Sequence, residues 1–279
     1  MINNYSKEFG YNIKLASPVM LGMVGHIMVS FADNIMVGQL GARELAAVSL
    51  GNSFFFIAMS LGVGFATAIT PLVAEADSSK NTKAVKSSLK HGLILCICIS
   101  LTLLLGMLFS VPLIENMNQP KDVVVLAMPY LKIISISIVP VVIFEGLKRF
   151  SDGLSKTKYP MYAAVFSNAL NIILNYLLIF GMFGFPKLGI IGAGIGTLIS
   201  RLLMVLFIVL IFINKDKIRA YFLNINIWKT EKKVFKKIFN LGFPSALQML
   251  FEVGIFTAAI WLSGTLGKIY QAANQIAFN

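Results

Sequence analysis

Long apolar stretches separated by short polar segments follow one another along the whole chain. A helix that crosses a bilayer takes about 20 residues at ~1.5 Å of rise per residue. Seven stretches reach that length, at approximately residues 13–38, 45–74, 88–114, 123–147, 160–183, 189–213 and 238–263, and an eighth begins near Tyr270. The pattern predicts an all-α fold, a polytopic bundle of membrane helices.

The first stretch differs from a simple membrane anchor because polar residues interrupt it. Pro18, His26 and Asp33 all lie inside its apolar run. A carboxylate at membrane depth is costly, so such a group usually faces a cavity or a partner. A proline removes a backbone donor, which membrane helices tolerate where neighbours satisfy the freed carbonyl. We therefore expect a helix bend at Pro18 and a functional role for Asp33.

The first and seventh stretches resemble each other. When residues 15–47 are laid on residues 241–273 without gaps, eight of 33 positions are identical, among them Pro18 with Pro244 and a shared Gly-x-Leu-Gly. Six stretches separate the copies, so both enter the membrane in the same direction, as in parallel-repeat transporters. We expect a six-helix N-terminal lobe at residues 1–213 and a basic cytoplasmic linker at 214–237. Residues 238–279 would begin a C-terminal lobe, and we interpret the chain as a fragment of a twelve-span protein.

Composition excludes a soluble globular protein, since 57% of the 279 residues are hydrophobic and only 13% are charged. The net charge of +12 would indicate a nucleic-acid partner in a soluble chain. Here the basic residues lie between apolar stretches, so we expect no nucleic acid. Cys96 and Cys98 stand two residues apart in an apolar run, which fits neither a disulfide framework nor a zinc site.

The basic residues gather on one side of the predicted membrane. Of the 24 lysines and arginines, 18 lie in the N-terminal segment and in the loops 77–90, 148–158 and 214–237. Four lie on the opposite side: Arg43, Lys121, Lys187 and Lys268. The positive-inside rule predicts a multi-pass protein of the cell membrane with its N-terminus in the cytoplasm.

Residues 231–241 combine a lysine face with an apolar face. Lys232, Lys233, Lys236 and Lys237 share one side of a helix, and Val234, Phe235, Ile238 and Phe239 share the other. This arrangement predicts a helix that lies on the anionic inner leaflet and leads into the seventh span. The alternative is a solvated charged loop.

Polar side chains at one depth predict an ion or proton site. Asn168, Asn171 and Asn175 share one face of the fifth span. Counted from the outer ends of their spans, Asp33, Asn175, Thr197 and Tyr130 reach a similar level. Oxygen ligands around one acid suit a proton or a hard cation such as Na⁺, and interhelical hydrogen bonding is the alternative interpretation.

Further polar groups are candidates for lining a cavity. Glu252 lies near the middle of the seventh span, and His26 is a weaker candidate. Arg201 and Lys132 are possible counter-charges. Gly192 and Gly196 form a G-x-x-x-G pair that indicates close helix packing. The sequence holds no P-loop, H-E-x-x-H, C-x-x-C or nucleophile elbow, so we expect neither an enzyme nor a cofactor beyond the coupling ion.

Several motifs in order resemble the multidrug and toxic compound extrusion (MATE) transporters, in their NorM-like branch. They are LASPVM and FADNIMVGQLGARELAAVSL in the first hairpin, FGFPKLGIIGAGIGTLIS after the fifth span, and LGFPSALQMLFE with LGKIYQAANQIAFN at the end. The resemblance covers essentially the whole chain. Asn175 stands where another branch carries an aspartate, and Asn274 stands where the family commonly has histidine.

The resemblance implies an antiporter that exports organic cations in exchange for Na⁺ or H⁺. It places the first-helix acid at Asp33, the bend at Pro18 and the seventh-helix acid at Glu252. The polar cluster of the N-terminal lobe maps onto Tyr130, Asn171, Asn175 and Thr197, and we add His26 and Gln275 as cavity residues. Membrane lipids and small organic cations are the expected partners of a monomeric protein. The alternatives are a lipid-precursor flippase of the same superfamily and a seven-helix receptor-like protein.

Overall fold

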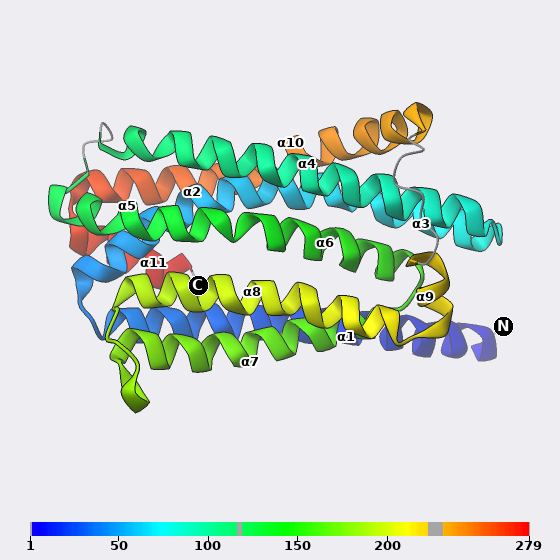
Figure 1. The fold of residues 1–279 in the computed structure, drawn as a ribbon, viewed down its shortest axis with the longest axis horizontal. Helices are drawn as coiled ribbons and strands as arrows, with labels where there is room; N and C mark the ends of the chain where they lie inside the picture. The colour runs from blue at the N-terminus through cyan, green and yellow to red at the C-terminus, as the bar shows by residue number, and fades with distance from the viewer. Residues whose placement is uncertain (1, 116–118, 223–230, 279) are drawn as a thin grey trace.

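The computed structural model describes residues 2–115, 119–222 and 231–278, and these form a long bundle of helices (Figure 1). The helices are α1 (Ile2–Gly38), α2 (Ala42–Thr67), α3 (Ile69–Ser78), α4 (Thr82–Glu115), α5 (Lys121–Ile136), α6 (Ile138–Gly153), α7 (Lys158–Phe180), the 3₁₀ turn η1 (Met182–Gly184), α8 (Ile190–Ile213), α9 (Asp216–Phe222), α10 (Lys232–Leu266) and α11 (Lys268–Phe278). Within the described residues, seven segments are long and apolar enough to cross a membrane, and they follow the predicted spans. The predicted all-α membrane bundle is confirmed.

Two predicted spans each consist of two helices. The second span is α2 followed by α3, which meet at Ala68, and the fourth is α5 followed by α6, which meet at Ser137. A proline, Pro71 or Pro140, stands three residues beyond each junction. Proline lacks the N–H and its ring clashes with the carbonyl four residues earlier, so each helix is interrupted just before it.

The helices α1 and α10 instead continue through their prolines, Pro18 and Pro244. Close to Pro18, the Thr157 hydroxyl donates a hydrogen bond to the Leu15 carbonyl at 3.1 Å. This bond ties the first part of α1 to the start of α7. The bend at Pro18 stays a prediction.

The centre of the bundle is α2, which packs against α4, α5, α6, α10 and α11, while α7 packs against both α1 and α8. Glycines let neighbours approach α2 closely. A Cβ added at Gly51 would overlap the ring of Tyr130, and one at Gly64 would overlap the backbone of Ala246. Small residues of this kind allow membrane helices to pack backbone against backbone.

The seventh span, α10, packs mainly against α2, with α4 and α11 as further neighbours. Large apolar side chains on its other faces are exposed, among them Phe251, Ile255 and Leu262. The division of the chain into an N-terminal lobe, a linker and the start of a second lobe stays a prediction.

The predicted linker 214–237 holds the short helix α9 and the start of α10, while its residues 223–230 lie outside the described ones. The amphipathic segment is helical, as predicted, and continuous with α10. Part of its apolar face packs on the protein instead of facing lipid. Ile238 is only 1% exposed and packs with Ala68 and Leu72, because the α2–α3 junction offers an apolar surface.

The basic segments lie together at one end of the bundle. Figure 1 places the N-terminus, the turn between α3 and α4, and α9 at the same end. The loop between α7 and α8 lies at the opposite end. This arrangement is the one that the predicted topology requires.

Candidate functional site

A row of hydrogen-bonded polar side chains joins α1, α7 and α8. Asn175 Nδ2 donates to Asp33 Oδ1 at 2.7 Å and to Asn171 Oδ1 at 3.2 Å. Asn171 Nδ2 in turn lies 3.2 Å from both Thr197 Oγ1 and Ser200 Oγ. The two asparagines are buried, and Asp33 is half-buried. The structure thus brings the four predicted ion-site residues together and adds Ser200.

Helical spacing explains the row. Asn171 and Asn175 are four residues apart and Thr197 and Ser200 are three apart, so each pair shares one face of its helix. Ser200 was missed, although its spacing from Thr197 could have indicated it. Gly196 lies on the side of α8 that faces α7. A Cβ at this position would stand 2.2 Å from Asn175 Oδ1. Only glycine lets α7 bring this amide so close to α8.

The cluster contains one buried oxygen that lacks a protein donor. Among the described residues, Asn175 Oδ1 has no hydrogen-bond partner. An unsatisfied buried acceptor costs about 1–3 kcal/mol. Asn168 Nδ2, about two turns before Asn175 on α7, is also buried without a partner among the described residues, and it lies beside Gly25 of α1. The interface between α1 and α7 therefore contains one hydrogen-bond acceptor and one donor that no described protein group satisfies.

The charge of Asp33 is balanced by opposing effects. Burial disfavours an ionised carboxylate, while the Asn175 hydrogen bond and the positive charge of Arg201 favour it. Arg201 makes no ion pair within 4 Å among the described residues. Its Nη1 donates to Ser137 Oγ at 2.5 Å, and its guanidinium lies 4.4 Å from the ring centre of Phe55. Asp33 is therefore a carboxylate with an amide donor in contact and no cationic group paired with it among the described residues.

The donor set suits a proton or a monovalent cation better than a multivalent metal. In the described part of the chain, no group of three His, Cys, Asp or Glu side chains could hold a metal ion. The row around Asp33 offers one carboxylate together with amide and hydroxyl oxygens. A single negative charge in an otherwise neutral oxygen set matches one positive charge.

Tyr130 lies beside this row without joining it. Its hydroxyl donates to Asn52 Oδ1 of α2 at 2.9 Å, and its ring fits between Gly51 and Gly194. The side chain is only 4% exposed. Sequence reasoning missed Asn52, although Ser49 stands three residues before it on the same helix face and could have marked it.

The remaining predicted cavity residues lie apart from the row. Gln275 Nε2 donates to Asn34 Oδ1 at 3.3 Å, which links α11 to the residue next to Asp33. His26 is exposed on α1. Glu252, expected to be a buried acid, is also exposed, because no described helix covers its side of α10. Lys132 is exposed as well.

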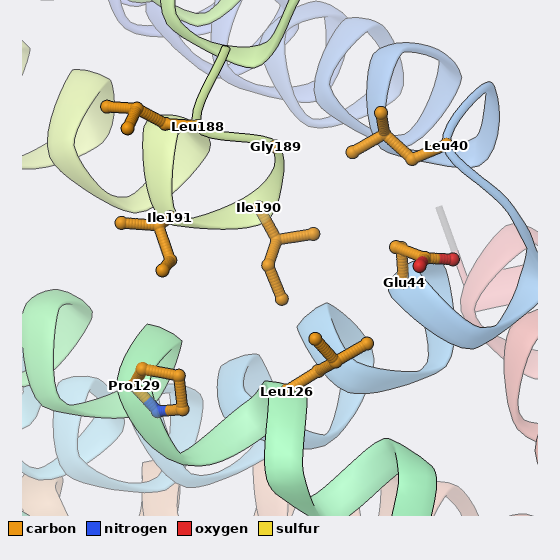
Figure 2. Close-up of a pocket in the computed structure, with 8 residues that line it drawn as sticks. All are labelled: Leu40, Glu44, Leu126, Pro129, Leu188, Gly189, Ile190 and Ile191. Atoms are coloured by element: carbon orange, nitrogen blue, oxygen red, sulfur yellow. The ribbon is translucent and has the colours of Figure 1, made fainter. Parts of the chain in front are cut away.

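A cavity of about 240 Å³ lies between the turn joining α1 and α2, α5, and the start of α8 (Figure 2). Its walls are largely apolar, with Leu126, Pro129, Ile190 and Ile191 facing one another and Glu44 at the edge. Glu44 is paired with Arg43 at 2.9 Å. None of the residues in the Asp33 row lines this cavity. It was not predicted because its lining comes from segments far apart in the sequence.

Comparison with known families and proteins gives consistent matches. The sequence model of the MatE family matches residues 18–177. The chain is 31% identical to the multidrug resistance protein NorM of Photobacterium profundum, across 100% of this chain and 61% of that protein. It is 32% identical to the probable multidrug resistance protein NorM of Rhizobium meliloti, across 99% of this chain and 59% of that protein. The chain therefore spans about three fifths of the length of these relatives.

Solved structures of transporters share the fold. An inward-facing multidrug resistance MATE family transporter of the MOP superfamily superposes with a TM-score of 0.78 at 24% identity, over 90% of this chain and 56% of that one. A MOP superfamily transporter from Pyrococcus furiosus superposes with a TM-score of 0.81 at 24% identity, over 96% of this chain and 60% of that one.

Proposed function

The chain belongs to the MatE family, and from this premise we propose that it supplies the ion-binding lobe of a secondary antiporter that exports cationic organic compounds in exchange for Na⁺ or H⁺. The relatives named above are multidrug resistance proteins. The observation that carries the proposal is the 2.7 Å bond from Asn175 to Asp33, next to the unpaired oxygen of the same amide. A carboxylate held in this way exchanges one neutralising ion for another.

Neutralising Asp33 changes the contact between α1 and α7. A proton on Asp33 removes the negative charge that the Asn175 amide now faces. A Na⁺ ion would use oxygens of Asp33 and Asn175, with Asn171 and Thr197 close by. Either event changes how α1 packs on α7, and the missing N–H of Pro18 makes α1 the helix that bends.

The cationic substrate would occupy a cavity next to this lobe in the complete transporter. Tyr130, His26, Glu252 and Gln275 are the residues that we propose line it. The N-terminus lies in the cytoplasm, and the protein is a monomer in the cell membrane. Each net charge that crosses the membrane is worth about 2.3 kcal/mol per 100 mV, which supports uphill export.

The substitution Asp33→Asn tests this function. It keeps the shape of the side chain but removes the charge that an ion neutralises. We expect ethidium efflux, driven by an imposed Na⁺ or H⁺ gradient, to be lost in cells that express the protein containing this sequence at normal level. Undiminished efflux would leave Asp33 as a packing residue and overturn the proposal.

A matched control is Asp122→Asn, the same chemical change at the start of α5. Asp122 pairs with Lys268 at 3.1 Å, and both side chains are largely exposed. An exposed ion pair adds little to stability, so this variant should keep efflux close to that of the unmodified protein.

A further inference from the structure

A buried histidine joins α4 to the start of α10. His91 is 0% exposed, although it lies only ten residues into α4. Its Nε2 lies 2.9 Å from the backbone nitrogen of Glu231, and its Nδ1 lies 2.7 Å from the carbonyl oxygen of Ser87. Glu231 is the N-cap residue of α10 and makes no capping bond with its own side chain. The ring of His91 thus satisfies a helix-end N–H from 140 residues away.

The two partners determine the protonation of the ring. A backbone N–H only donates, so Nε2 must present its lone pair to Glu231. A carbonyl oxygen only accepts, so Nδ1 must carry the hydrogen toward Ser87. Only the neutral ring, in this one tautomer, makes both bonds.

The surrounding contacts complete a small docking site. The Ser87 hydroxyl donates to Glu231 Oε1 at 3.1 Å, and the Phe235 ring meets the His91 ring edge-on at 5.2 Å between centres. Two turns further along α10, Lys237 pairs with Glu75 of α3 at 2.9 Å. These contacts hold the first turns of α10, residues 232–241, against α3 and α4; we call this segment the arm of α10.

The arm and the rest of α10 make different contacts. Gly242 packs on Phe65, and Ala246 packs on Gly64, with backbone in near contact. Between them, Pro244 offers no N–H to the Asn240 carbonyl, which weakens the helix at that turn. The glycine contacts hold the span to α2, whereas the arm is held by the His91 docking site, by Ile238 and Val234 against the α2–α3 junction, and by the Phe239 ring on Phe65.

We propose that His91 is a protonation-sensitive latch that holds the arm of α10 on α4 when neutral and releases it when charged. A second proton would put an N–H at Nε2, directly opposite the N–H of Glu231, and both bonds cannot then form. The bond is made to the neutral ring, so the contact is present at higher pH and lost as the pH falls.

The carboxylate that reaches this site, that of Glu231, already accepts a hydrogen bond from the Ser87 hydroxyl. At the basic end of α4 and of the elements that pack against it, the charged groups are Lys83, Lys86 and Lys90 on α4, Glu75 and Asp77 on α3, Glu231, Lys232, Lys233, Lys236 and Lys237 on α10, Asp216, Lys217 and Arg219 on α9, and Glu145, Lys148, Arg149 and Asp152 on α6. Lysines outnumber carboxylates, and Glu75 already pairs with Lys237. A charged His91 therefore gains little to offset the lost backbone bond.

Amide hydrogen exchange of the purified chain in lipid nanodiscs tests the latch. Exchange of the arm and of Glu231 is compared at about pH 7.5 and about pH 5.5, after correction for intrinsic exchange rates. We expect protection of the arm to fall about fivefold at the lower pH, the effect of losing one hydrogen bond of average net strength. Protection of α8 should not change.

Two variants separate the latch from general acid sensitivity. His91→Phe keeps a ring in place but removes both nitrogens, so the arm should exchange fast at both pH values while α8 stays protected. His26→Phe changes the only other histidine, which is exposed on α1, and should leave the pH dependence of the arm intact. The measurement needs no transport, so its outcome is independent of the antiporter proposal.

Three results would overturn the latch. One is arm protection that does not depend on pH in the unmodified chain. Another is stronger protection at the lower pH, which would mean that the Glu231 carboxylate rather than its N–H holds the ring. The third is an unchanged pH dependence in His91→Phe.

Discussion

At the scale of residues, the polar row around Asp33 depends on the absence of a Cβ at Gly196. Asn175 reaches Asp33 because Gly196 leaves room for its amide against α8. On the same helix, Gly194 faces Tyr130 and Ile133, and a Cβ added there would come no closer than 3.3 Å to either. The two glycines are two residues apart, yet only one of them is in direct contact with the row. The row therefore depends on a missing side chain as much as on those present.

The substitution Gly196→Ala should damage the site. The added Cβ would stand 2.2 Å from Asn175 Oδ1, so the amide must move away from its place between Asp33 and Asn171. Overpacking of this kind costs about 1–3 kcal/mol. We expect a lower midpoint of thermal unfolding together with reduced ethidium efflux.

The matched control is Gly194→Ala, whose added Cβ would lie 3.3 Å from the Ile133 side chain. A few tenths of an ångström of side-chain movement accommodates it, so efflux and stability should change less than in Gly196→Ala. Equal effects in the two variants would show that the row does not depend on Gly196.

At the scale of helices, the contact between α2 and α10 is an approach of two backbones. Trp261 of α10 donates through Nε1 to Ser53 Oγ at 2.9 Å, and Phe54 lies against the same indole ring. Closer to the basic end, Gly64 meets Ala246. The direct attachment of the seventh span to the first six therefore runs along α2.

The substitution Gly64→Ala should loosen this attachment. Its Cβ would stand 2.3 Å from the Ala246 Cα, and backbone cannot move aside as a side chain can. We expect the free energy of unfolding to fall by about 1–3 kcal/mol, measured by thermal or denaturant unfolding in detergent.

Gly106→Ala in α4 makes the same change where a Cβ would meet nothing within 4 Å. Alanine is favoured over glycine in a helix by about 1 kcal/mol, so this variant should be as stable as the unmodified chain or more stable. A loss of stability in Gly106→Ala as large as in Gly64→Ala would argue against a specific contact between α2 and α10.

At the scale of the whole molecule, the basic residues gather at one of the two ends of the helix bundle. The basic loops lie at the end that carries the N-terminus, α3 and α9. Lys187, in the loop between α7 and α8, lies at the opposite end with few other basic residues. The anionic inner leaflet and the membrane potential favour the lysine-rich end in the cytoplasm.

Cysteine labelling tests this orientation. Lys187→Cys should react with a membrane-impermeant maleimide in intact cells, because the positive-inside rule predicts this loop on the outer side. Lys83→Cys, in the turn between α3 and α4, should react only after the cells are permeabilised. Both are placed in a background in which serine replaces Cys96 and Cys98, and the reverse pattern would invert the topology.

Sequence alone determined the seven spans, the side on which basic residues gather, and the face of asparagines on the fifth span. These features are local, since apolar length, charge and helical spacing can be read within one segment. The repeat between the first and seventh spans also lies in the sequence itself. The breaks before Pro71 and Pro140 could not be predicted in this way, because α1 and α10 continue through Pro18 and Pro244.

Tertiary structure alone decided which polar groups meet. The bonds from Asn175 to Asp33, from Gln275 to Asn34 and from Glu231 to His91 join residues 142, 241 and 140 positions apart. Each depends on how a helix is rotated about its axis and on which neighbour approaches it. Those rotations follow from packing along the whole helix, such as the glycine contacts of α2, and the residues that form a bond do not encode them. For this reason Glu252, expected to be buried, is exposed, and His91 became visible only in the fold.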